Sequence, residues 1–309
     1  MDDVSPFDYL SFISTIIICL TFSVVYVLGL YVLSPSLHRY QRNHPNVICR
    51  RFVAVLIVCS LVYLFLKHTS NSNININTWL GFRRNIASKW ILFFYPTLLT
   101  LLLYLGPIIQ WIDLFDWRYY SHNWNHILPF QDTHEQLIFI RNYLVAPFTE
   151  EFVFRSSILC LLYSHVSLFS AIFYSPLFFG LAHFHHMLEH FKQNHNEKGH
   201  RLSAINIILI HLFQFSYTYI FGVYSSFLFI RTGHFIPSFI IHTLCNSLGI
   251  PDFMNLIDLN DGHRKRKIIY MICYIIGLWL FSTNLYALTQ SNFYYSNDSS
   301  IIIYRHWSS

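Results

Sequence analysis

The sequence predicts an all-α, polytopic membrane protein with about eight transmembrane helices around an intramembrane active-site cavity. Of its 309 residues, 54% are hydrophobic and only 11% are charged, whereas soluble proteins carry about 25% charged residues. Apolar runs near the length of about 20 residues that crosses a bilayer as a helix recur along the whole chain. No fixed-period repeat is present, so residues 1–309 are expected to form a single membrane domain.

The apolar runs define the expected elements in chain order. The eight candidate spans are Leu10–Leu33, Phe52–Leu66, Trp90–Ile109, Leu137–Tyr163, Val166–Phe184, Ile205–Ile230, Phe235–Leu248 and Ile268–Leu288. The second and the seventh are short for about 30 Å of hydrocarbon, and the seventh is compatible with a partly re-entrant segment. Lys and Arg are more frequent in the connections that follow the odd-numbered spans, which predicts that these connections are cytosolic and both termini lumenal.

Charge and cysteine usage exclude several classes of function. The net charge of +5 is modest, and the basic residues lie mostly between apolar runs, which is not the clustered basic face of a nucleic-acid-binding protein. The six cysteines are scattered, and no Cys-x-x-Cys pair indicates a zinc knuckle or a redox pair. The lipid bilayer is therefore the expected environment, and no nucleic-acid partner is expected.

The fourth span contains an unusual group of charged residues. Glu150 and Glu151 are adjacent, and Arg155 follows one helical turn later. A carboxylate at membrane depth costs about 2.5 to 3.5 kcal/mol on insertion scales unless a partner compensates it. A pair of carboxylates at this depth indicates a functional site.

Two other spans each carry polar or aromatic residues four positions apart, a spacing that places both on one helix face. The fifth span has Phe179 and His183, and the seventh has His242 and Asn246. A single membrane histidine is often only hydrogen-bonded to a neighbouring helix. A carboxylate pair, an arginine, two histidines and an asparagine on three spans are harder to attribute to packing.

The charged residues of the fourth span divide by what each can do. Arg155 keeps its charge and is suited to hold a carboxylate, and Glu151 has the i,i+4 spacing for that pairing. Glu150 points elsewhere and is predicted to act as a base, since a carboxylate removed from water becomes a better proton acceptor. An imidazole can take up and release a proton near neutral pH, so His183 could share a water molecule with Glu150.

The polar pair of the seventh span completes the predicted chemistry. His242 and Asn246 could donate hydrogen bonds to a developing oxyanion. Water activated by a base beside such a site would hydrolyse a peptide or an ester, without a Ser or Cys nucleophile.

The motifs Glu-Glu-x-x-x-Arg, Phe-x-x-x-His and His-x-x-x-Asn, in this order, resemble those of the CAAX protease and bacteriocin-processing family of intramembrane glutamate proteases. The flanking residues narrow the resemblance to the eukaryotic type II CAAX prenyl proteases. These flanking segments are 141–149, 178–186, 214–218 and 229–234. The resemblance covers residues 138–253, which are the predicted catalytic core.

This resemblance implies an endopeptidase of the endoplasmic reticulum membrane, with an active site accessible from the cytosol. Its substrates would be farnesylated or geranylgeranylated CAAX proteins, such as Ras-like small GTPases, which would lose their last three residues. It implies that Glu150 and His183 activate a water molecule and that the seventh-span pair forms an oxyanion site. It implies no cofactor. The implied catalytic residues are Glu150, His183, His242 and Asn246, with Glu151, Arg155 and Phe179 in support.

Two alternatives remain at this stage. One Glu and two His could ligate a catalytic zinc, although the sequence lacks a His-Glu-x-x-His helix and the ligands would converge from three spans. His185, His186 and His190 are expected to face the membrane interface rather than to add ligands. A transporter or proton relay could also use intramembrane Glu, His and Arg, but the inverted repeats typical of transporters are not visible.

Overall fold

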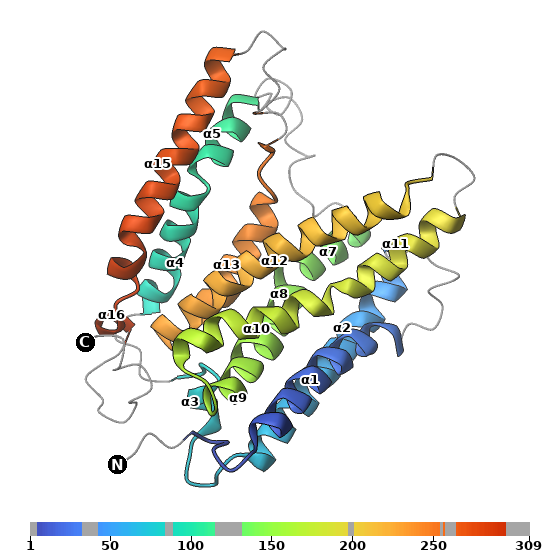
Figure 1. Cartoon of the computed structure of the whole chain (residues 1–309), viewed down its shortest axis with the longest axis vertical. Helices are drawn as coiled ribbons and strands as arrows, with labels where there is room; N and C mark the ends of the chain where they lie inside the picture. The colour runs from blue at the N-terminus through green and yellow to red at the C-terminus, as the bar shows by residue number, and fades with distance from the viewer. Residues whose placement is uncertain are drawn as a thin grey trace. The chain divides into compact units, whose positions relative to one another are not determined.

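Figure 1 shows the computed structural model of the chain, which describes residues 5–32, 43–83, 89–114, 132–196, 201–253, 256 and 264–294. Every regular element within these residues is a helix. The predicted all-α fold class is therefore confirmed. The sequence also contains an N-glycosylation sequon, Asn297-Asp298-Ser299, on the tail that is expected to be lumenal; this sequon lies outside the described residues.

The chain divides into two compact units. Unit 1 comprises Met1–Arg83 and Phe148–Ser238, and unit 2 comprises Arg84–Pro147 and Phe239–Ser309. The helices of unit 1 are α1 (Phe12–Val32), α2 (Pro45–Thr69), α3 (Ile76–Trp79), η3 (Phe152–Ile158), α9 (Leu159–Tyr163), α10 (Leu168–Ala182), α11 (Phe184–Asn196) and α12 (Ala204–Thr232). Those of unit 2 are α4 (Lys89–Leu103), α5 (Leu105–Leu114), α7 (Thr133–Ile140), η2 (Arg141–Val145), α15 (Arg264–Leu288) and α16 (Ser291–Tyr294). Two helices cross the unit boundaries: α8 (Ala146–Glu151) and α13 (Phe235–Leu248). The prediction of a single membrane domain stays a prediction.

Five of the described helices are long and apolar enough to cross a membrane, namely α1, α2, the continuous α10–α11 segment, α12 and α15. The bent pair α4 and α5 would make a sixth span. The chain is thus a multi-pass membrane protein, whereas the predicted count of eight spans stays a prediction.

The third predicted span contains a sharp bend. Helices α4 and α5 meet at Tyr104 at an angle of 70°. Pro107 has no N–H to donate to the carbonyl of Leu103, so the helical hydrogen-bond ladder is interrupted at this point. Hydropathy predicted a single span over Trp90–Ile109 and gave no sign of the bend, because it does not register the missing donor.

The fourth predicted span is a succession of short α- and π-helical segments rather than one regular helix. The segments follow one another without a gap: α7, η2, α8, η3 and α9. In η3 the hydroxyl of Ser157 donates to the carbonyl of Phe152, five residues earlier, at 2.9 Å. Such π-helical turns occur mostly within α-helices and frequently at functional sites.

The segment formed by η3 and α9 is the core of unit 1. All of its residues from Phe152 to Leu162 are buried, and η3 contacts α1, α2, α10 and α12. Around it, α1 packs along α2, and α10 packs along α12 (Figure 1). Glu151, the last residue of α8, directly precedes η3 and is buried at the centre of this unit.

Helix α12 has clear start and stop signals. The hydroxyl of Ser203 accepts the backbone N–H of Asn206 at 3.3 Å and caps the N-terminus. At the other end Gly233 has a φ of 61°, a left-handed conformation that glycine adopts without strain, and its N–H donates to Phe229 O at 2.8 Å.

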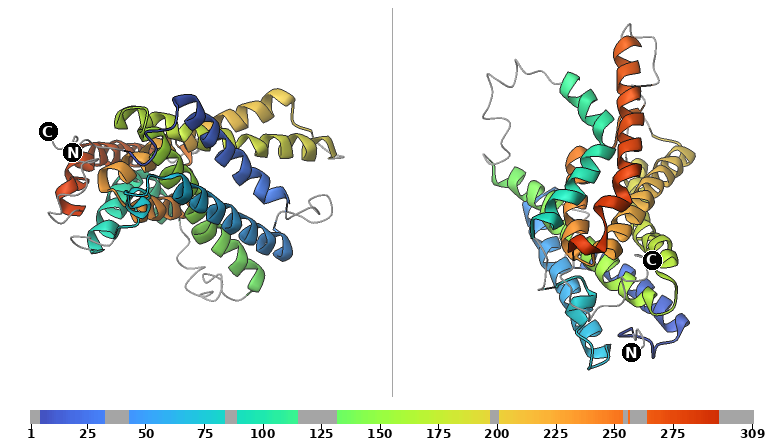
Figure 2. Two further views of the ribbon diagram at one scale, coloured as in Figure 1. Left: turned by 90° about the horizontal axis from the view of Figure 1, so that it is seen from below. Right: turned by 90° about the vertical axis from the view of Figure 1, so that its left-hand side faces the viewer.

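In unit 2, α15 lies along both α4 and α5 (Figure 2). Two glycines permit this close packing. A Cβ at Gly277 would lie 2.5 Å from Leu102 O, and a Cβ at Gly106 would lie 2.3 Å from the ring of Tyr274. Both distances are too short for any side chain, so these positions require glycine.

Candidate active site

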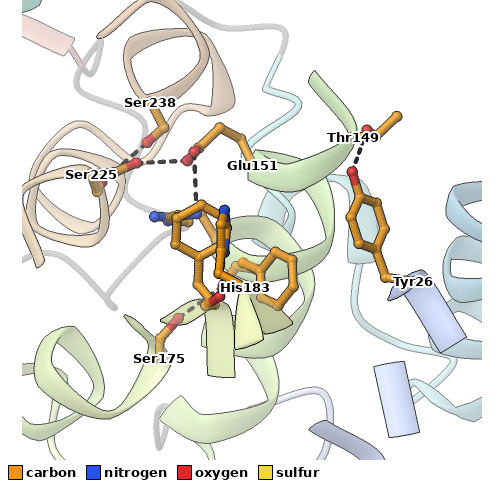
Figure 3. Close-up of polar contacts among 10 residues, drawn as sticks. Tyr26, Thr149, Glu151, Ser175, His183, Ser225 and Ser238 are labelled. Atoms are coloured by element: carbon orange, nitrogen blue, oxygen red, sulfur yellow. Dashed lines mark hydrogen bonds and ion pairs between the residues drawn. The ribbon is translucent and has the colours of Figure 1, made fainter. Parts of the chain in front are cut away.

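Glu151 and Arg155 form an ion pair at the centre of unit 1. Arg155 Nη1 lies 3.2 Å from Glu151 Oε1, and both side chains are 0% exposed. Ser225 of α12 donates its hydroxyl to Glu151 Oε2 at 2.6 Å, and Ser238 donates to the backbone carbonyl of Ser225 at 3.1 Å (Figure 3). Both carboxylate oxygens of Glu151 are therefore occupied, as the i,i+4 spacing to Arg155 leads one to expect.

The Arg155 guanidinium contacts two aromatic rings. Its Cζ is 4.2 Å from the ring centroid of Phe179 and 5.3 Å from that of Phe221. A desolvated cation over an aromatic face is stabilised by the ring quadrupole, by about 2 kcal/mol. A Cβ at Gly222 would lie 3.2 Å from Arg155 Nη2, so the absence of a side chain there lets α12 pass close to the cation.

The two adjacent glutamates have different surroundings. Successive helical residues point about 100° apart; Glu151 is fully buried, whereas Glu150 is half-buried. The preceding residue, Thr149, is anchored by two helices. Tyr26 Oη of α1 lies 3.0 Å from the Thr149 hydroxyl (Figure 3), and Cys59 Sγ of α2 donates to the Thr149 carbonyl at 3.9 Å. The backbone that carries Glu150 is thus fixed from α1 and α2.

His183 lies at the junction between α10 and α11. Its Nδ1 is 2.8 Å from the carbonyl oxygen of Phe179, and the two rings meet edge to face with centroids 4.6 Å apart. Because a carbonyl oxygen only accepts hydrogen bonds, Nδ1 carries the hydrogen, and the neutral ring has its lone pair on Nε2. This tautomer allows His183 to accept a proton through Nε2.

His242 and Asn246 lie on the part of α13 that belongs to unit 2. Asn246 donates through Nδ2 to the carbonyl of Asn142 at 2.9 Å, and Thr243 donates to the carbonyl of Tyr143 at 2.8 Å. These bonds tie α13 to η2. An amide nitrogen has two N–H groups, so Asn246 retains a second donor beside the one directed at Asn142.

The predicted site residues are thus distributed over both units. Unit 1 holds Glu150, Glu151, Arg155, Phe179 and His183, and unit 2 holds His242 and Asn246. In unit 1, Phe179 does more than the predicted support of a helix, because it contacts both the Arg155 guanidinium and the His183 ring.

Sequence reasoning missed several residues that hold this site. They are Tyr26, Thr149, Phe221, Ser225 and Ser238. For the four with a hydroxyl the available signal was that hydroxyl within an apolar helix, as in the Ser225-Ser226 pair of α12. Phe221 is one of many apolar residues and gave no such signal.

Among the described residues, no three His, Cys, Asp or Glu side chains gather as a group of metal ligands.

Comparison with known proteins decides the family. A family model described as type II CAAX prenyl endopeptidase Rce1-like matches residues 133–248. Human CAAX prenyl protease 2 is 36% identical to the chain, over 93% of this chain and 84% of the human protein. The chain belongs to the type II CAAX prenyl endopeptidase family.

Further relatives agree with this assignment. CAAX prenyl protease 2 of Arabidopsis thaliana is 34% identical over 75% of this chain and 78% of the relative. A probable CAAX prenyl protease 2 of Schizosaccharomyces pombe is 29% identical over 84% and 88%. No solved structure gives a significant match.

As a CAAX prenyl endopeptidase family member, the chain is a peptidase, which confirms the predicted family and class of enzyme. The family match includes all seven predicted site residues, since they lie between residues 150 and 246. The roles of these residues in the reaction are proposals, which follow.

Proposed function

We propose that the chain removes the C-terminal tripeptide from farnesylated or geranylgeranylated CAAX proteins, Ras-like small GTPases among them. We further propose that it does so in the endoplasmic reticulum membrane, with its active site open to the cytosol. The names of its relatives, which span animals, plants and fungi, support a CAAX substrate. Family membership is the observation that carries the proposal.

The proposed nucleophile is a water molecule activated by Glu150 and His183. Glu151 is unsuited to this role, because Arg155 and Ser225 occupy its oxygens and it is fully buried. Glu150 is only half-buried and lies beside a residue anchored by α1 and α2. His183 presents the lone pair of Nε2, because Nδ1 is engaged with Phe179.

The proposed reaction is a hydrolysis of the peptide bond after the prenylated cysteine. The water oxygen bonds to the carbonyl carbon while its proton passes to the base, and His242 and Asn246 donate hydrogen bonds to the resulting oxyanion. When the C–N bond breaks, the retained proton passes to the leaving amine. The products are a prenylcysteine carboxylate and a free tripeptide. No metal is needed for these steps.

One experiment tests both the reaction and the absence of a metal. A farnesylated CAAX peptide is incubated with membranes that contain the chain, and the products are analysed by mass spectrometry. Loss of the three C-terminal residues supports the proposal, and an unchanged peptide or another cleavage position contradicts it. The same reaction is expected to continue after exhaustive chelation; loss of activity that zinc restores would instead establish the zinc-dependent alternative.

Replacement of Asn246 by alanine is expected to lower kcat by about 10²- to 10³-fold, the usual effect of removing one oxyanion donor. Thr243→Val is a matched control, because it removes the neighbouring bond between α13 and η2 and leaves the amide in place. Steady-state kinetics on the farnesylated peptide measure both variants. Equal losses in the two variants would show that Asn246 only holds α13 in place.

A further inference from the structure

A second group of polar side chains follows His183 on the next turns of the helix. Glu189 of α11 accepts a hydrogen bond on each carboxylate oxygen: Tyr31 Oη of α1 donates to Oε1 at 2.8 Å, and His186 Nδ1 lies 3.2 Å from Oε2. The side chains of His186 and Glu189 are 23% and 22% exposed. His186 is thus paired within unit 1, and its expected position at the membrane interface stays a prediction.

This group reaches the proposed catalytic histidine. The His186 ring meets the His183 ring edge to face, with centroids 6.0 Å apart and an angle of 62° between the planes. On its other side, His186 packs against the His185 ring at 3.9 Å. Because a carboxylate only accepts, His186 Nδ1 carries a hydrogen toward Glu189, and this bond fixes the orientation of the ring. A continuous series of contacts therefore runs from Tyr31 through Glu189 and His186 to His183.

The position of His183 explains why such support is needed. It lies between the end of α10 at Ala182 and the start of α11 at Phe184, rather than within either helix. A catalytic side chain must be held within about 0.5 Å and 10–20° of its productive geometry. The carbonyl of Phe179 constrains the ring from the α10 side. His186 contacts it from the α11 side, and Tyr31 ties α11 to α1.

We propose that His186 and Glu189 are positioning residues for His183, and that Tyr31 anchors them. The inference rests on the proposed function, because it assumes that His183 acts on the water. It requires that changes in this group alter the rate of the chemical step and leave substrate binding unchanged.

The expected sizes of the effects on thermal stability and on kcat distinguish a positioning role from a purely structural one. The bond between His186 and Glu189 is partly exposed, and partly exposed pairs contribute little to stability, so its loss should change thermal stability only slightly. A displacement of about 1 Å in a catalytic group can lower the rate by about 100-fold. A large effect on kcat without a large effect on stability therefore distinguishes positioning from folding.

The test uses the full-length protein in detergent micelles and the farnesylated peptide. Glu189→Gln is expected to lower kcat by about 10- to 100-fold, with KM within about twofold of wild type and thermal stability unchanged. Tyr31→Phe is expected to change kcat in the same direction by a smaller factor. Tyr63→Phe is the matched control, because it removes a tyrosine hydrogen bond to Asn77 elsewhere in unit 1 (3.0 Å), and it should leave kcat unchanged.

Two variants of His186 separate its hydrogen bond from its ring. His186→Asn keeps an N–H donor for Glu189, whereas His186→Phe keeps a ring beside His183 and loses the donor. The asparagine variant is expected to retain more activity, because it preserves the bond to Glu189.

Wild-type kcat in Glu189→Gln and Tyr31→Phe would overturn the inference, as would a loss of kcat that follows a loss of thermal stability. Neither result would affect the proposed function. Full activity of His183→Ala would overturn the proposed role of His183 in activating the water, and with it the premise of this inference, but not the removal of the tripeptide.

Discussion

Replacement of Glu150 by glutamine is expected to abolish removal of the C-terminal tripeptide. The amide has the shape of the carboxylate but cannot accept the proton of the attacking water, so the contribution of general-base catalysis, about 10²- to 10⁴-fold, is lost. Glu150→Ala should have the same effect. The rate of tripeptide release from the farnesylated peptide, followed by mass spectrometry, measures both variants.

The neighbouring glutamate cannot take over this role. Both oxygens of Glu151 are engaged, by Arg155 and by Ser225, and the side chain is fully buried. Glu135→Gln provides the control, because Glu135 is an exposed residue of α7, and the same chemical change there should leave the rate unaltered. Near-wild-type activity of Glu150→Gln would reject the assignment of Glu150 as the base.

Replacement of Arg155 by methionine is expected to destabilise the protein by about 3 to 5 kcal/mol, the usual effect of removing one partner of a buried ion pair. The Glu151 charge would remain at a fully buried position, with the Ser225 hydroxyl as its neutral donor. The guanidinium contacts with Phe179 and Phe221 would be lost as well. Thermal unfolding in detergent micelles measures the loss of stability.

A double variant shows whether the uncompensated charge is the cause. Glu151→Gln combined with Arg155→Met removes both charges, and it should be more stable than Arg155→Met alone, because no buried charge is left without its partner. Equal stability of the single and double variants would mean that lost packing dominates. Wild-type stability of Arg155→Met would refute the structural role of the pair.

The sequence predicted the elements wherever one local property determined them. The bounds predicted for the seventh span, Phe235–Leu248, are those of α13, because Gly233 and Gly249 flank a predominantly apolar segment. The spacing of Glu151 and Arg155 predicted their pairing, because residues one helical turn apart share a face. The assignment of all seven residues to catalysis or support stays a prediction.

Other features depend on contacts between distant segments and could not be predicted. Helix α11 continues past the expected end of the fifth span, because Glu189 and His190 find partners in Tyr31 of α1 and His211 of α12. Ser225 bonds to Glu151 across 74 positions of sequence. The π-helical turns of η2 and η3 leave no signature in the spacing of apolar residues.

The ring of Phe179 has a consequence for how this enzyme can vary. It contacts the Arg155 guanidinium, which pairs with Glu151 in the core of unit 1, and also the His183 ring, which is proposed to activate the water. A change that moves this ring therefore acts on fold and chemistry together. Substitutions near Arg155 and substitutions near His183 are therefore coupled through this ring. A substitution that compensates for a change beside Arg155 will also alter the surroundings of His183.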